Sequence, residues 1–127
     1  MIDQKMPRIL IAEDEKALAR VLELKLTKAG FAVMIAEDGE EASKLLANEH
    51  FDLLLLDLVM PKKDGFAVLS ELAGKKATLP VVVLSNLGQT EDERKAKVLG
   101  AVDYWVKADI SLVDVVNRIK KLLDISA

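Results

Sequence analysis

The most constraining feature of this chain is a run of four leucines at positions 53–56 that ends at Asp57. Four apolar residues in a row, followed by a turn, are typical of a strand that is buried on both faces of a parallel sheet. A carboxylate that follows such a strand lies where open α/β sheets bind their ligands. A second apolar run, residues 9–12, is followed by the acidic residues 13–15. If the two strands are neighbours, at least three carboxylates converge at one edge of the sheet.

The carboxylates of Glu13, Asp14 and Asp57 predict a site for a divalent cation. Like charges that are held close together raise each other's pKa unless a cation neutralises them, and an all-oxygen donor set suits Mg²⁺. Two simpler interpretations exist, because an acid can stabilise the start of a helix and Asp57 can begin an Asx-turn. One acid is sufficient for the helix, and the turn after Asp57 has its own turn formers in Pro61 and Asp64. We therefore prefer the metal site.

Apolar patterning predicts five strands that alternate with five helices within a single domain, residues 1–127. Thr90 and Glu93 predict a capping box for the fourth helix, and Leu122 and Leu123 are both assigned to the inner face of the last one. Alternating strands and helices form a parallel sheet covered on both faces, and five strands are too few for a closed eight-stranded barrel. The expected fold is therefore a doubly wound α/β sheet of the flavodoxin-like type or a close relative. The strands are expected at residues 8–12, 32–36, 52–56, 81–84 and 101–106, and the helices at 16–28, from 38 onward, 65–74, 90–100 and 111–123.

Composition excludes several classes of protein. With 127 residues, 51% of them hydrophobic, the chain can build one ordinary core. A net charge of -3 argues against broad binding of nucleic acid by charge, and the absence of cysteine excludes disulfides and thiolate metal sites. The amino terminus is not a secretory signal, and no apolar stretch approaches the roughly 20 residues that span a bilayer. We expect a cytoplasmic protein that binds neither membranes nor nucleic acid directly.

Two further polar residues, Ser85 and Lys107, follow the fourth and fifth predicted strands. Ser85 is equally well explained as a turn residue or as a donor to a phosphoryl oxygen. Most lysines are solvated, but Lys107 follows a strand toward the acids, where its ammonium would pair with Asp57 or with a phosphoryl group on it. Beside Mg²⁺, Asp57 can be a metal ligand, a nucleophile that forms an aspartyl phosphate, or both.

In chain order, these motifs resemble the receiver domain of two-component response regulators, a family that includes the chemotaxis receivers. The similarity covers essentially the whole chain and implies a flavodoxin-like sheet with strand order 2-1-3-4-5. The residues that carry it are the pair Glu13-Asp14, the segment 57–61 with Asp64-Gly65, Ser85, and the segment from Gly100-Ala101 through Asp103-Tyr104 to Lys107.

The resemblance implies a role for each site residue. Asp57 would accept phosphate from the histidine of a sensor kinase or of a phosphotransfer protein. Ser85 and Lys107 would contact the phosphoryl group. The implied Mg²⁺ ligands are the side chains of Glu13, Asp14 and Asp57 and the backbone carbonyl of Val59.

The resemblance also implies a switch formed by Ser85 and Tyr104. Tyr104 would rotate inward when Ser85 moves, so that the surface of residues 90–106 and 111–123 changes. This surface would control a downstream effector or output domain, and a homodimer through the same surface is a further option.

Two residues depart from the family pattern. Ala108 follows Lys107, where the family has a proline joined by a cis bond. A cis bond before another residue costs about 2.5–4 kcal/mol more than a trans bond. The bond between Lys107 and Ala108 is therefore either trans, with the loop placed differently from the family's, or cis and strained. Asn86 is larger and more polar than the small residue usual after Ser85.

Lys62 and Lys63, close to Asp57, are expected to be solvated loop lysines.

Two other functions compete with a signalling switch. A Mg²⁺-dependent phosphohydrolase could use Asp57 as nucleophile. The acid/base that haloacid-dehalogenase-type phosphatases place two residues later is here Val59, which cannot transfer protons. A flavin-binding domain needs a phosphate loop rich in Ser, Thr and Gly after the first strand, where the acidic residues 13–15 would repel the flavin phosphate. We therefore expect a signalling switch rather than an enzyme.

Overall fold

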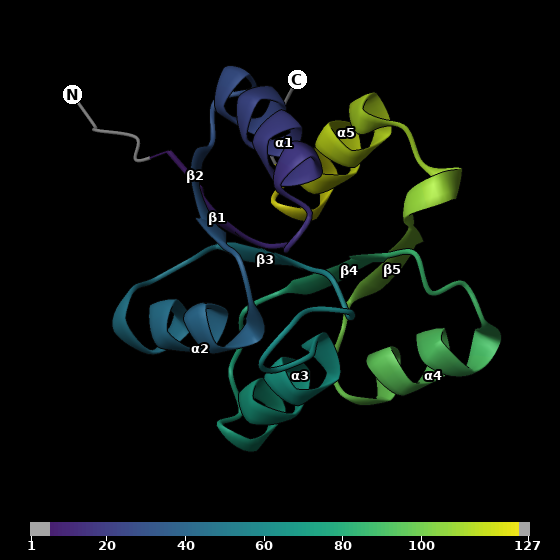
Figure 1. Ribbon diagram of the computed structural model, residues 1–127. Helices are drawn as coiled ribbons and strands as arrows, with labels where there is room; N and C mark the ends of the chain where they lie inside the picture. The colour runs from purple at the N-terminus through teal and green to yellow at the C-terminus, as the bar shows by residue number, and fades with distance from the viewer. Residues whose placement is uncertain (1–5, 125–127) are drawn as a thin grey trace.

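The computed structural model describes residues 6–124 and shows a parallel sheet between two layers of helices (Figure 1). The five strands follow the order β2-β1-β3-β4-β5, which confirms the expected doubly wound, flavodoxin-like fold. The strands are β1 (Arg8–Ala12), β2 (Ala32–Ala36), β3 (Leu53–Leu56), β4 (Val81–Ser85) and β5 (Asp103–Val106).

The helices divide between the two faces of the sheet. Figure 1 shows α1 and α5 on one face and α2, α3 and α4 on the other. No helix among residues 6–124 is both long and apolar enough to cross a bilayer. The helices are α1 (Lys16–Lys28), α2 (Gly39–Asn48), α3 (Gly65–Gly74), α4 (Thr90–Val98) and α5 (Leu112–Leu122), and a short 3₁₀ helix, η1 (Lys107–Asp109), follows β5.

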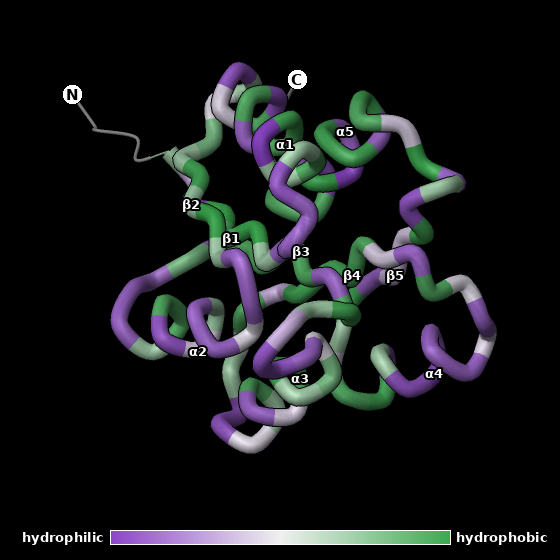
Figure 2. The backbone as a smooth tube through the Cα atoms, in the orientation of Figure 1, coloured by the Kyte–Doolittle hydropathy of each residue, from purple (hydrophilic) through white to green (hydrophobic). Residues whose placement is uncertain are grey.

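The four leucines of β3 are buried on both faces of the sheet, as the sequence predicts. Leu54 and Leu56 belong to the core under α2, α3 and α4. Leu53 and Leu55 belong to the core under α1 and α5. Figure 2 shows the hydrophobic colouring of the central strands between the two helical layers. The alternation follows from the two-residue period of a strand.

The register of β1 and β3 brings the acidic residues together. Ala12 lies opposite Leu56, so both strands end at the same level. The backbone N–H of Asp57 donates to the carbonyl of Ala12 at 3.0 Å. Glu13 and Asp57, the residues that follow these strands, are therefore neighbours at the carboxyl edge of the sheet.

Two local predictions are wrong. Gln89 is the N-cap of α4 and Thr90 already lies inside the helix, so the expected capping box does not form. The helix starts early because the N–H groups of Asp92 and Glu93 both donate to the carbonyl of Gln89. Leu122 is 41% exposed.

Leu123, which is also predicted on the inner face of this helix, does lie there. Leu123 is half-buried and packs with the core under α1 and α5. Ile119 is buried, and an α-helix has 3.6 residues per turn. Leu123, four positions later, therefore lies closer to the face of Ile119 than Leu122, three positions later. Elsewhere the strand ends differ from the expected ones by one or two residues, as at Asp52, which precedes β3.

Candidate functional site

The carboxylates of Glu13, Asp14 and Asp57 meet at the carboxyl edge of the sheet, as predicted. One carboxylate oxygen from each residue lies within 4.8 Å of the other two. Glu13 and Asp57 are only 3% and 5% exposed, because each directly follows a central strand. Asp14 is exposed. Two buried acids and one open to solvent fit a hard divalent cation that keeps part of its water shell.

Lys107 brings a positive charge to the two buried acids. Its Nζ lies 2.8 Å from Oε1 of Glu13 and 3.1 Å from Oδ2 of Asp57. The bond between Lys107 and Ala108 is trans, and Lys107 begins η1. Of the two alternatives that Ala108 left open, the structure has the trans bond, and Lys107 still reaches the acids.

Burial changes the proton affinity of these groups. Desolvation raises the pKa of Glu13 to about 7, although the hydrogen bond from Lys107 lowers it. Burial alone would lower the pKa of Lys107, but the hydrogen bonds and charges of Glu13 and Asp57 outweigh it and raise that pKa. A cation at the cluster would favour the ionised form of Glu13.

The backbone around Asp57 is tightly packed. The N–H of Val59 donates to Oδ1 of Asp57 at 3.3 Å. The N–H of Gly65 donates to the carbonyl of Leu58 at 2.9 Å. A Cβ at position 65 would lie 2.4 Å from the Asp57 carbonyl oxygen, so only glycine fits at the start of α3. Asp64 caps this helix by accepting from the N–H of Ala67.

Ser85 and Tyr104 are joined through Leu87. Ser85 is fully buried at the end of β4, and its hydroxyl accepts from the N–H of Leu87 at 3.4 Å. The Tyr104 hydroxyl donates to the carbonyl of Leu87 at 2.5 Å. Tyr104 is 8% exposed, so its ring already points inward. Desolvation raises the pKa of Tyr104 to about 12, which keeps this hydroxyl a donor.

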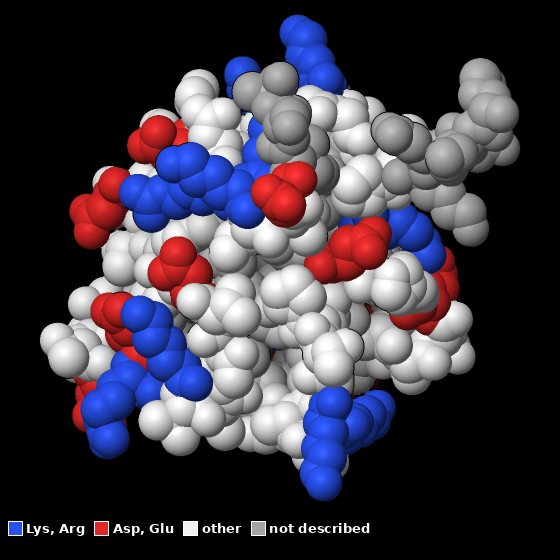
Figure 3. Space-filling view, turned by 180° about the vertical axis from the view of Figure 1, so that it is seen from behind, with Lys and Arg blue, Asp and Glu red and all other residues white. Residues whose placement is uncertain are grey.

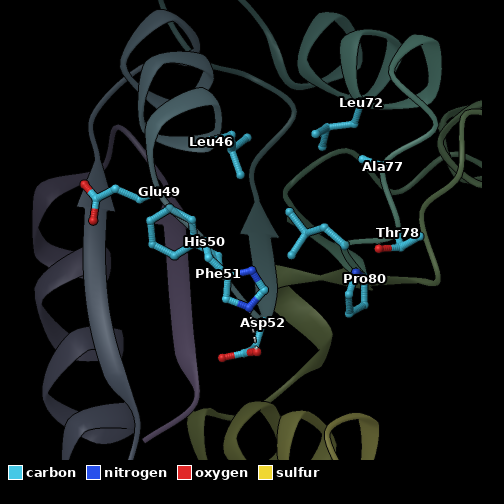
Figure 4. A pocket seen from close by; sticks show the side chains of 10 residues that line it. Leu46, Glu49, His50, Phe51, Asp52, Leu72, Ala77, Thr78 and Pro80 are labelled. Carbon is cyan, nitrogen blue, oxygen red and sulfur yellow. Dashed lines mark hydrogen bonds and ion pairs between the residues drawn. The ribbon is translucent and has the colours of Figure 1, made fainter. Parts of the chain in front are cut away.

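Two hollows of the surface lie outside the cluster of Glu13, Asp14 and Asp57. The one beside Glu13 has a volume of about 100 Å³, below the range of about 300–1,000 Å³ typical of organic ligands, and neither Asp14 nor Asp57 lines it. A larger one, of about 340 Å³, lies where β3 and β4 begin (Figure 4). Its polar lining includes His50, whose Nε2 lies 3.2 Å from Oδ1 of Asp52.

The sequence does not indicate what Lys63 does. It predicts a solvated lysine, whereas Nζ of Lys63 bonds to Ser43 on α2 and to Glu71 on α3. These partners are 20 and 8 positions away in the chain, and no local spacing rule connects them. The contact between Gly39 and the Lys63 backbone is missed for the same reason.

Residues 9–120 match the family model described as the response regulator receiver domain. The chain belongs to the response regulator receiver family. The resemblance inferred from the motifs is therefore confirmed. This receiver domain is a signalling switch rather than an enzyme, and Glu13, Asp14 and Asp57 form its acidic pocket for phospho-aspartate signalling.

Curated relatives and solved structures agree with this assignment. The probable transcriptional regulator ycf27 of Cyanophora paradoxa is 40% identical over 116 residues, which are 91% of this chain and 48% of the relative. The DNA-binding dual master transcriptional regulator RpaA of Synechocystis is 37% identical over 93% of this chain and 49% of its own length. The receiver thus spans about half the length of these curated relatives.

A solved structure shows what the same fold can bind. The response regulator TrrA from Thermotoga maritima, in complex with Mg²⁺-BeF, has a TM-score of 0.82 and 30% sequence identity. The alignment covers 92% of this chain and 99% of TrrA. The receiver domain of Francisella response regulator 1452 has a TM-score of 0.88, again at 30% identity, over 93% of this chain and 97% of its own.

Proposed function

We propose that this receiver accepts a phosphoryl group on Asp57 from a sensor histidine kinase or a phosphotransfer protein. The observation that carries the proposal is the contact of the buried Asp57 carboxylate with Lys107, 3.1 Å away, inside a cluster of three acids. A carboxylate can attack phosphorus only if the negative charge of the phosphoryl oxygens is neutralised. The acids can hold a cation for this purpose, and Lys107 supplies a fixed positive charge.

The proposed metal is Mg²⁺, held by Glu13, Asp14, Asp57 and the backbone carbonyl of Val59. The donor set fits this ion, because it consists of oxygens and includes an exposed acid that leaves room for water. When bound, the ion would neutralise charge on the phosphoryl oxygens. The Mg²⁺-BeF complex of TrrA supports this assignment by analogy.

The transfer is a displacement at phosphorus. A carboxylate oxygen of Asp57 forms a bond to phosphorus while the bond from phosphorus to the donor's histidine nitrogen breaks. The donor ring is protonated on its other nitrogen, so it takes the electron pair and leaves as neutral imidazole. The Lys107 ammonium redirects one of its hydrogen bonds from the two acids to a phosphoryl oxygen. The Ser85 hydroxyl turns to donate its O–H to a second phosphoryl oxygen, and this movement shifts the oxygen that accepts from the N–H of Leu87.

The change at Ser85 is proposed to reach the surface through Tyr104. Both residues bond to Leu87, which precedes α4, so movement of Ser85 alters the support of the Tyr104 hydroxyl. The surface of α4, β5 and α5 then binds a downstream effector, an output domain or a second copy of the chain. This is a bistable element that a new dianion biases.

For the chain as a whole, we propose one receiver domain over residues 1–127 that works in the cytoplasm. Its curated relatives are transcriptional regulators about twice as long, so control of transcription through a separate output part is the proposed effect. The proposal includes no direct contact of this domain with nucleic acid or membrane. On the face that Figure 3 shows, acidic and basic side chains are interspersed, which argues against binding of nucleic acid by charge on that face.

The test is the intact mass of the protein after incubation with acetyl phosphate and Mg²⁺. The wild type should gain one phosphoryl group, and both Asp57→Asn and chelation of Mg²⁺ should abolish the gain. Asp52→Asn is the matched control, because Asp52 precedes the same strand that Asp57 follows. Equal labelling of Asp57→Asn and wild type would overturn the proposal.

A further inference from the structure

The loop between β3 and α3 contains a turn that a lysine rarely adopts. The N–H of Lys63 donates to the carbonyl of Pro61 at 2.8 Å, which closes a γ-turn with Lys62 at its centre. Lys62 has a φ of 70°, as in the form of the γ-turn that is rare and strained. A residue other than glycine keeps such a backbone only where its surroundings hold it there. The contacts around this loop therefore matter for its shape.

The side chain of Lys63 ties the loop to two helices. Its Nζ donates to Oγ of Ser43 on α2 at 3.0 Å and to Oε2 of Glu71 on α3 at 2.5 Å. The Ser43 hydroxyl donates in turn to Oε1 of Glu71 at 2.6 Å. The Lys63 side chain is only 25% exposed. The three side chains form a closed polar network between the loop, α2 and α3.

The backbone of Lys63 is confined as well. Gly39, the first residue of α2, lies so close that a Cβ there would be 1.9 Å from the Lys63 carbonyl oxygen. Asp38, the N-cap of α2, lies 3.6 Å from Nζ of Lys62 through its Oδ2. The start of α2 therefore supports the strained turn directly.

The other end of the same loop is the candidate metal site. The loop begins at Asp57, to which Val59 donates its N–H, and it is closed by the bond from Gly65 to Leu58. Because the loop is short and closed at both ends, a displacement at Lys63 must be absorbed near Asp57 and Val59.

We propose that Lys63 is a positioning residue for the cation site: with Ser43 and Glu71 it holds the strained loop in the shape that the site needs. This inference rests on the function proposed above. Simple electrostatics makes the opposite prediction, because removing a positive charge from the loop that begins at Asp57 should strengthen the binding of a cation. The sign of the change in Mg²⁺ affinity therefore separates positioning from charge.

The experiment is a titration of the full chain with Mg²⁺, followed by the amide NMR shifts of residues 57–65. Lys63→Met should weaken Mg²⁺ binding by about three- to tenfold, the effect of one net hydrogen bond. Lys63→Arg keeps donors for Ser43 and Glu71 and should bind nearly as the wild type does. Lys62→Met is the matched control: it removes the same charge one position away and loses only the exposed 3.6 Å ion pair with Asp38, while the Lys63 network stays intact.

A second background tests the role of strain. In Lys62→Gly the turn is no longer strained, so the additional change Lys63→Met should have little effect on Mg²⁺ affinity. Unchanged or stronger binding by Lys63→Met in the wild-type background, or equal weakening by Lys62→Met, would overturn the positioning role and leave the proposed function intact. A wild type that binds no Mg²⁺ would overturn both.

Discussion

At the scale of single residues, the site depends on charges that are buried beside one another. Glu13, Asp57 and Lys107 could be predicted as neighbours because each directly follows a strand, and strand ends are local features of the sequence. The conformation of Tyr104 could not be predicted from the sequence, because it depends on a hydrogen bond to Leu87 across the sheet edge. The network of Lys63 could not either, because it joins residues from three separate elements.

The pKa of Glu13 leads to a prediction for the pH dependence of metal binding. Since burial raises this pKa to about 7, a proton competes with the cation below that pH. Mg²⁺ should bind about tenfold more tightly at about pH 8 than at about pH 6, as measured by calorimetric titration. Glu13→Gln should bind Mg²⁺ more weakly, and its affinity should no longer change between these two pH values. Equal wild-type affinity at both values would contradict the role of Glu13.

At the scale of elements, most strands and helices could be predicted because apolar runs and cap residues are local signals. Asp38, Asp64 and Ser111 all cap helices with their side chains. The capping box at Thr90 failed because the start of α4 is set by backbone bonds to Gln89. The 3₁₀ helix at Lys107 was missed because it has no comparable signal in the sequence.

Gly65 allows a prediction about how α3 meets the site. The added Cβ of Gly65→Ala would collide with backbone atoms of Asp57 and Leu58, which cannot move aside cheaply. We expect a loss of about 2–4 kcal/mol in the free energy of unfolding, measured in urea, together with weaker Mg²⁺ binding.

Gly74, at the other end of α3, provides the control. A Cβ added at this residue would have no neighbouring atom within 4 Å, so Gly74→Ala should stabilise the protein by about 0.4–1 kcal/mol. Similar stabilities for the two variants would show that the close contact at Gly65 is not what requires glycine.

At the scale of the whole molecule, the site and the proposed output surface share one edge of the sheet. Ser85 ends β4, Tyr104 lies on β5, and α4 begins shortly after Leu87. Ala96 is the one residue of α4 that is buried, so this helix is held by few core contacts. A small change at Ser85 can therefore shift α4 more easily than the other helices.

This arrangement predicts that Ser85→Ala separates phosphorylation from its response. Asp57 should still be labelled by acetyl phosphate, because its own contacts are intact. Addition of beryllofluoride with Mg²⁺ should change the amide shifts of α4 and β5 clearly less than in the wild type. Shift changes of full size in Ser85→Ala would show that the signal takes another route.

The central claim is that Asp57 carries the phosphoryl group, and chemical mapping of the modified residue tests it most directly. Borohydride reduces an aspartyl phosphate to homoserine, which peptide mass spectrometry locates in the chain. After acetyl phosphate and Mg²⁺, homoserine is expected at position 57 and nowhere else, and it should be absent without Mg²⁺. Homoserine at position 14 or 52 would contradict the account. So would the complete absence of homoserine from a sample treated with both acetyl phosphate and Mg²⁺.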